Sequence, residues 1–120
     1  MGADQIAAIR PAIAEVEQAP SGEEWCASFE VPNSAHWVQV VPGTLNMSYP
    51  YADDPADRLQ RIGIAPNTLH LVDWQPGKYA TFTYAPLPNR EIAKLVDRLF
   101  VTLLGCDGDT YEVGVALERV

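Results

Sequence analysis

The hydrophobic positions between 88 and 117 follow first a helical period and then a strand period. Apolar residues recur every three or four positions from 92 to 104, which predicts a helix with one buried face. Asn89 is expected to cap this helix, and Gly105 to end it. Apolar and polar residues then alternate from Tyr111 to Leu117, which predicts a strand with one buried face. The apolar stripe of the helix consists of Ile92, Leu95, Val96, Leu99, Phe100, Leu103 and Leu104.

The first part of the chain carries a second helical pattern. Ile6, Ile9, Ile13 and Val16 fall on one side of a helix over residues 3–18. Pro11 interrupts this pattern because it has no backbone N–H, so the helix either kinks at Pro11 or begins there.

Two hairpins follow, and their turns predict the register of three strands. With Asn33-Ser34 and Pro42-Gly43 at the turn centres, Phe29 lies opposite Val38 and Val38 opposite Met47. A slip by one residue would bury Gln39 and Asn46, so it is rejected. The apolar face of these strands also holds Ala27, Val40 and Leu45. The other face holds Cys26, Ser28, Glu30, Trp37, Gln39, Val41, Asn46 and Ser48.

A short helix and a third hairpin complete the predicted elements. Asp53-Asp54-Pro55 is a typical helix start, and Gly63 ends the helix. The hairpin joins strands 69–74 and 79–84 around Pro76-Gly77. Its inward positions are Leu69, Leu71, Ala80, Phe82 and Tyr84, and its outward positions are His70, Val72, Trp74, Tyr79, Thr81 and Thr83.

The order of these elements predicts a single α+β domain over residues 1–120. We expect an antiparallel β-sheet of about six strands, with two long helices on one face and one short helix. The second face of the sheet is then left to solvent or to a partner.

Composition and charge narrow the class of partner. The chain has 120 residues, with 16 acidic and 8 basic side chains and a net charge of −8. This charge repels nucleic acid and anionic membrane surfaces, so neither is an expected partner. A basic or amphipathic protein segment is a better candidate, although acidity also simply keeps small proteins soluble. Without a signal peptide pattern, a cytoplasmic location is expected. Cys26 and Cys106 suit reduced thiols.

No group of residues predicts catalysis, so we expect no enzyme activity, no cofactor and no metal. The two histidines, His36 and His70, fall on opposite faces of the predicted sheet. Asp107-Gly108-Asp109 with Glu112 lacks the spacing of a calcium loop and fits a tight turn. Asp53, Asp54 and Asp57 are expected at a helix start.

The outward aromatic residues are the strongest candidates for a binding site. An exposed apolar patch on a sheet usually marks an interaction surface, and aromatic side chains dominate the energy of such interfaces. The alternative is that the first helix or a loop covers them. The predicted partner-binding residues are Trp37, Gln39, Val41, Val72, Trp74 and Tyr79.

Most of the chain, roughly residues 1–118, resembles a known family. The residues Trp37-Val38-Gln39-Val40, Gly43, Leu45, Asn46, Tyr49-Pro50, Leu59, Ile62-Gly63, Pro66 and Trp74 resemble the pattern of bacterial YbjN-like and type III secretion chaperone-related domains. Val96, Leu99 and Phe100 are similar to the same pattern. The resemblance implies a secretion-chaperone fold, often a homodimer, that holds an extended client segment and has no enzymatic activity. The strand after the long helix departs from that fold.

Two functional hypotheses lead, and the third is an enzyme without a recognisable motif, which a deep pocket with converging polar groups around His70 would favour. In the first, the open face and edge of the sheet receive a client peptide or a second copy of the chain. In the second, an immunity-type or inhibitory protein caps a basic effector through its acidic surface, which predicts one salt-sensitive partner.

Overall fold

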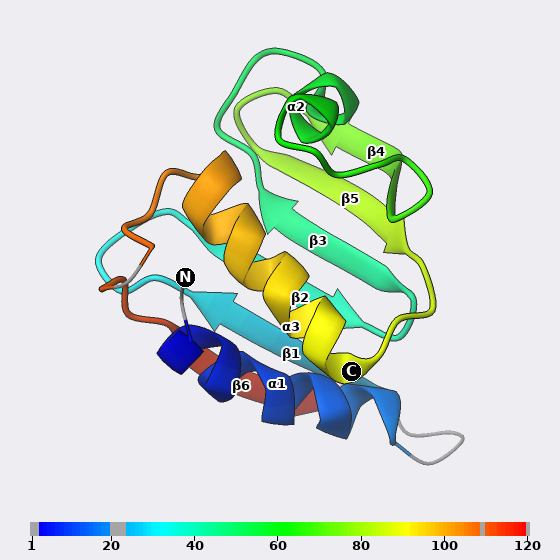
Figure 1. Ribbon diagram of the computed structural model, residues 1–120, viewed down its shortest axis with the longest axis vertical. Helices are drawn as coiled ribbons and strands as arrows, with labels where there is room; N and C mark the ends of the chain where they lie inside the picture. Colours follow the sequence, from blue (N-terminus) through cyan, green and yellow to red (C-terminus); the bar gives the residue numbers. More distant parts are fainter. Residues whose placement is uncertain (1–2, 20–23, 109, 120) are drawn as a thin grey trace.

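The protein folds as a six-stranded antiparallel sheet with helices packed on it, as the computed structural model in Figure 1 shows. Residues 3–19, 24–108 and 110–119 are described. The helices are α1 (Ala3–Glu17), α2 (Pro55–Arg61) and α3 (Asn89–Arg98), and a π-helical turn, η1 (Leu99–Leu103), extends α3. The strands are β1 (Trp25–Glu30), β2 (Trp37–Val41), β3 (Thr44–Ser48), β4 (Leu69–Gln75), β5 (Tyr79–Tyr84) and β6 (Gly114–Arg119).

The strands lie in the order β4-β5-β3-β2-β1-β6. The last strand therefore returns to pair with the first, from Trp25 opposite Arg119 to Glu30 opposite Gly114. Because a strand at the end of a sheet has a neighbour on one side only, β4 and β6 both carry unpaired backbone groups. The α+β class and the antiparallel six-stranded sheet agree with the sequence prediction.

The predicted register of the first two hairpins is confirmed. Phe29 lies opposite Val38, and Val38 lies opposite Met47. Val40 lies opposite both Ala27 and Leu45 in the next row. All of these side chains are fully buried, so the turn at Pro42-Gly43 and the apolar pattern together determine which face of the sheet forms the core.

The helices cover this buried face. In Figure 1, α1 and α3 lie in front of the sheet, with α2 beside β4. Pro11 lies inside α1, so it does not begin the helix. The expected pair of long helices is only partly present, because α1 has 15 residues and α3 has 10. The seven residues of the predicted stripe, from Ile92 to Leu104, are all buried.

The two ends of α3 differ from the prediction. The N-cap is Pro88 rather than Asn89, because Pro88 adopts the extended conformation of a cap residue and Asn89 is already helical. Beyond Arg98 the helix widens into the π-turn η1, in which the Leu104 N–H bonds to the Leu99 carbonyl at 2.9 Å. Gly105 then adopts a φ of 77°, as expected for the residue that ends a helix.

Candidate functional site

Trp74, a predicted partner-binding residue, lies on the covered face of the sheet. It pairs with Ala80, which is fully buried, and directly paired residues share a face. Its ring packs against the core beside Tyr49. The prediction that Trp74 faces outward is therefore wrong, and Trp37 and Trp74 lie on opposite faces of the sheet.

A β-bulge explains this error. The predicted register assumed a two-residue turn at Pro76-Gly77, but Gln75 pairs with Tyr79, so three residues form the loop. The extra residue is absorbed between Leu71 and Asp73, where the register shifts. On the side of the bulge away from the loop, Leu71 pairs with Phe82 and Leu69 pairs with Tyr84, as predicted. The bulge thus reverses the predicted facing of Asp73 as well as that of Trp74, whereas Leu69, His70 and Leu71 keep theirs.

Trp37, Gln39, Val41 and Tyr79 stay on the uncovered face but do not form one apolar patch. Trp37, whose N–H bonds to the Ser48 hydroxyl at 3.0 Å, lies in a row with Ser48 and Tyr79. The next row is polar: Gln39 lies opposite Asn46, whose side-chain oxygen accepts a hydrogen bond from Thr81 at 2.9 Å. This polar row separates the two aromatic rings from Val41, which lies opposite Thr44. Val72 lies apart from both, on the β4 edge of the sheet.

The exposed apolar side chains gather instead at the two edges of the sheet. Within the described ranges, the large hydrophobic residues that are exposed are Val72 at 55%, Val115 at 42% and Leu117 at 40%. Val72 belongs to β4, and the other two belong to β6. The bulge at Val72 distorts the β4 edge, which is a common device against edge-to-edge pairing. The β6 edge has no such distortion, because it pairs with β1 without a break over six residues.

The last strand, β6, differs from its prediction in where it begins and in how exposed it is. Alternation predicted a strand over 111–117 with one buried face, but the strand begins at Gly114 and its residues after Gly114 are exposed. Val115 and Leu117 pair with Phe29 and Ala27, so they do face the helix-covered side. They remain exposed because the strand lies at the rim of that side. Tyr111 is buried, but it lies before the strand.

The residues with catalytic potential do not converge. In the described part of the chain, no three His, Cys, Asp or Glu side chains could hold a metal ion together. His70 borders a hollow of about 320 Å³ between α2 and β4 whose other lining residues are apolar. They are Ala56, Leu59, Ile64, Pro66, Leu69 and Leu71.

The acidic residues before α2 have structural partners. The Asp54 carboxylate accepts a hydrogen bond from the Ala56 N–H at 2.8 Å and so caps α2, as predicted. Asp53 accepts a hydrogen bond from the Arg58 guanidinium at 2.7 Å, which lowers the pKa of this carboxyl group below its ordinary value. These two carboxylates thus stabilise the start of a helix.

Comparisons with known proteins identify no family for this chain. No family model matches the chain, and neither a curated protein nor a solved structure matches it. The resemblance to YbjN-like and secretion chaperone-related domains therefore stays a prediction. Over the described residues, no helix has both the length and the apolar character needed to cross a bilayer.

Proposed function

We propose that this protein is a non-enzymatic binding module that receives an extended segment of a client protein as a seventh strand beside β6. The observation that carries the proposal is that β6 is an unbroken edge strand with two exposed aliphatic side chains, Val115 and Leu117. Strand addition uses backbone hydrogen bonds for affinity and side-chain contacts for selectivity. Both are available at this edge.

The two faces of β6 would select different client side chains. On the helix-covered side, Val115 and Leu117 lie two residues apart and would contact alternate apolar residues of the client. On the open side, Gly114 and Ala116 are small and leave space for larger client side chains. A suitable client strand would therefore carry apolar residues at the alternate positions that face Val115 and Leu117, and it could carry larger side chains at the positions between them.

The open face would extend the same site. Ala116 lies in the row of Ser28 and Gln39, and Gly114 lies in the row of Glu30 and Trp37. A client strand on β6 would thus continue rows that already end on Gln39 and Trp37. In this proposal Trp37 and Gln39 are secondary contacts, and Trp74 packs against the core.

A peptide selection with a matched pair of variants tests the proposal. A peptide library is selected on the wild-type protein, and the best peptide is titrated against the Val115→Lys/Leu117→Lys variant and against Val72→Lys. Lysine on an exposed edge opposes strand pairing, so we expect the β6 variant to bind at least about tenfold more weakly. Val72→Lys changes an exposed valine on the opposite edge and should keep full affinity.

Two further measurements separate this proposal from its alternatives. Methylation of alternate backbone amides of the peptide should abolish binding, because strand addition needs those N–H groups. Equal affinity of both lysine variants, or no selected peptide at all, would contradict the proposal. A wild-type dimer that the β6 variant converts to a monomer would show that a second copy occupies this edge. Loss of binding in high salt alone would favour the alternative of an acidic cap on a basic effector.

A further inference from the structure

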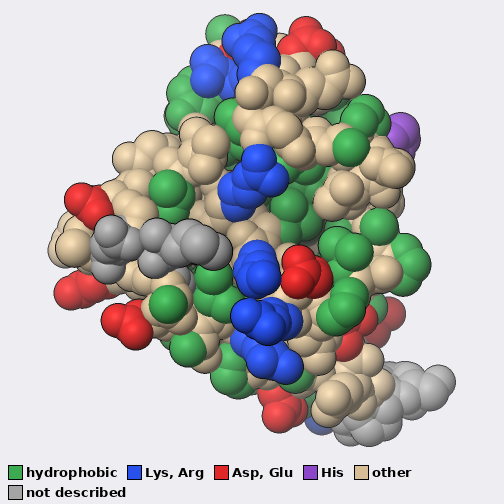
Figure 2. All heavy atoms as spheres, in the orientation of Figure 1, with side chains coloured by type: hydrophobic (Ala, Val, Ile, Leu, Met, Phe, Trp, Pro, Cys, Tyr) green, Lys and Arg blue, Asp and Glu red, His purple; other side chains and the backbone are tan. Residues whose placement is uncertain are grey.

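The outer surface of α3 carries a row of basic side chains on a chain whose net charge is −8. Arg90, Lys94 and Arg98 follow one another at four-residue intervals, which places them on one side of the helix. Arg58 and Arg61 of α2 bring the number of basic residues on these two helices to five of the chain's eight. Figure 2 shows Lys and Arg side chains gathered in a column on the face of the molecule that carries α2 and α3.

This row opposes the stability of its own helix. Like charges four residues apart on a helix destabilise it by roughly 0.2–0.5 kcal/mol per pair. Arg90 also lies in the first turn, where the helix dipole disfavours a positive charge. Glu91 offsets part of this cost because it pairs with Lys94 at 3.5 Å, whereas Asp97 is buried against Tyr111. Folding therefore accounts for Lys94, through this ion pair, and for Arg98, which lies in the last turn where the helix dipole favours a cation, but it leaves Arg90 unexplained.

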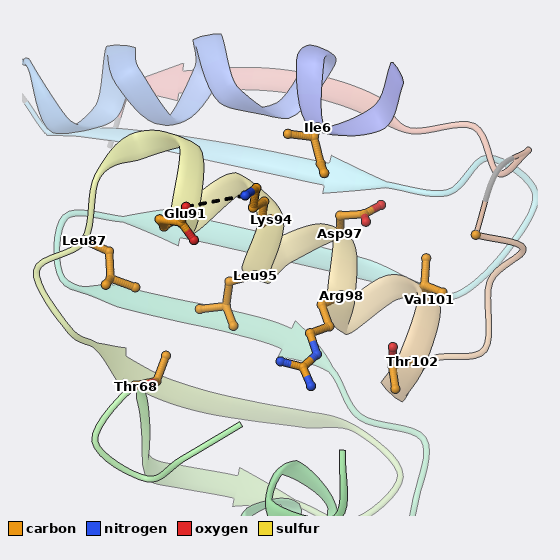
Figure 3. Close-up of a pocket in the computed structure, with 11 residues that line it drawn as sticks. Ile6, Thr68, Leu87, Glu91, Lys94, Leu95, Asp97, Arg98, Val101 and Thr102 are labelled. Atoms are coloured by element: carbon orange, nitrogen blue, oxygen red, sulfur yellow. Dashed lines mark ion pairs between the residues drawn. The ribbon is translucent and has the colours of Figure 1, made fainter. Parts of the chain in front are cut away.

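A hollow of about 660 Å³ accompanies the basic row, and its lining combines apolar side chains with two cations, Lys94 and Arg98, and two carboxylates, Glu91 and Asp97. Figure 3 shows Ile6 reaching from α1 toward the side of α3 that carries Lys94 and Asp97, Arg98 projecting from the other side, and Leu87 lying on the connection that precedes α3. Leu95 and Val101 add apolar surface along the helix. Arg98 is held in place because its guanidinium donates a hydrogen bond to the Ile62 carbonyl, across the gap between α3 and α2. The surface thus offers apolar contact beside one cation that is held in place, Arg98, and one that is paired with Glu91, Lys94.

We propose that this surface is a second docking site, which binds an amphipathic acidic peptide helix lying along α3. Carboxylates spaced by one turn on such a helix would face Arg90, Lys94 and Arg98, whose backbone positions span about 12 Å at 1.5 Å per residue. Apolar side chains of the same helix would fill the hollow beside Leu87 and Leu95. A long polyanion such as DNA fits less well, because the remaining surface of the protein repels it.

The test uses three synthetic 20-residue helical peptides and two double variants. The peptides share one leucine face and carry glutamate or lysine on the other face, and a third replaces the leucines of the glutamate peptide with glutamine. We expect the wild-type protein to bind the glutamate peptide with leucines most tightly. Arg90→Gln/Lys94→Gln should weaken this binding about tenfold, as expected for two lost charge contacts. Arg10→Gln/Lys78→Gln removes the same charge elsewhere on the surface and should leave the affinity unchanged.

The outcomes that overturn the proposal are distinct from those for the β6 edge. No binding of the glutamate peptide, equal weakening by both glutamine variants, or tighter binding of a 20-base-pair DNA duplex would each exclude the proposed partner. Thermal unfolding of both variants checks that the fold is intact. The Val115→Lys/Leu117→Lys variant should bind the glutamate peptide like the wild type. The proposals for the α3 surface and for the β6 edge are therefore tested independently.

Discussion

The ring of Trp74 packs edge to face against the ring of Tyr49, with the ring centroids 5.9 Å apart and the planes at 88°. Tyr49 is fully buried and also contacts Tyr51 in the same manner, at 5.4 Å. Aromatic pairs with this geometry add to the free energy of burial. Trp74 is therefore a partly buried side chain that packs against the core at the β4 end of the sheet.

The two tryptophans of the predicted site should differ in their effect on stability. Trp74→Ala removes a partly buried ring that packs on the core beside Tyr49, so we expect it to lower the free energy of unfolding by about 1–3 kcal/mol. Trp37→Ala removes a half-buried ring from the uncovered face and should cost less than about 1 kcal/mol. Urea titrations of both variants measure the difference. Equal losses would place both rings in the same environment and contradict the register.

The Tyr111 hydroxyl should stabilise the fold through Asp97. It donates a hydrogen bond at 2.7 Å to this carboxylate, which is only 7% exposed. Tyr111→Phe leaves a buried charged acceptor without this donor, so we expect a loss of about 1–3 kcal/mol.

Tyr79→Phe is the matched control for Tyr111→Phe. The Tyr79 hydroxyl also donates to a carboxylate at 2.7 Å, but Asp73 is exposed there and water can replace the donor. The loss should stay below about 0.5 kcal/mol. A loss as large as that of Tyr111→Phe would show that burial does not set the energy of these bonds.

Alkaline pH should unfold the protein through its buried tyrosines. Burial raises the pKa of Tyr49 from 10.0 to about 12, with a further rise from the nearby Asp53 carboxylate, and burial likewise raises the pKa of Tyr84 and Tyr111. The unfolded chain ionises near pH 10, so these groups stabilise the fold fully below that pH. For Tyr49, stability then falls as the pH rises from 10 to about 12.

Urea midpoints at pH 8, 10 and 11 measure this effect. The free energy of unfolding should decrease above pH 10, and Tyr49→Phe should make the decrease shallower because one ionisable group is removed. A wild-type stability that stays constant from pH 8 to 11 would contradict the raised pKa values.

Replacement of Gly43 by alanine should lower the stability of the fold more than replacement of Gly114. Its φ is 79° in the β2–β3 turn, and an added Cβ would meet no atom within 4 Å, so only backbone strain opposes Gly43→Ala. We expect a loss of about 1–2 kcal/mol. At Gly114 the nearest atoms lie 3.6 Å away and φ is not in the left-handed region, so Gly114→Ala should be neutral or stabilising. Thermal unfolding compares the two, and a neutral Gly43→Ala would rule out strain at the turn.

Most of the sheet register could be read from the sequence because short turns leave little freedom. The two residues of Pro42-Gly43 determine the facing of every residue in β2 and β3. The same reasoning predicted the wrong face for Trp74. The β4–β5 loop has three residues, and the bulge at Val72 compensates for the extra residue, so the strand ends far from the loop keep the predicted pairing. The sequence did hold a signal against the two-residue turn: that register turns the charged Asp73 toward the helix-covered face, whereas the bulge turns it outward, opposite Thr81.

The candidate binding surfaces depended more strongly on the assembled fold. The spacing of Arg90, Lys94 and Arg98 is visible in the sequence, but the hollow beside them forms only when Ile6 and Leu87 approach α3. The exposure of Val115 and Leu117 had no sequence signal, because alternation indicates which residues share a face and not whether that face is covered.

Local patterns along the chain were thus sufficient for the α+β class, the buried stripe of α3, the Asp54 cap and the pairing of β1, β2 and β3, because each depends on residues close in sequence or on a short turn. The facing of Trp74, the edge position of β6 and the composition of the surface over α3 came from contacts between distant segments. Such contacts depend on which strand ends the sheet and on how far each helix reaches, and neither is encoded in the period of a single element.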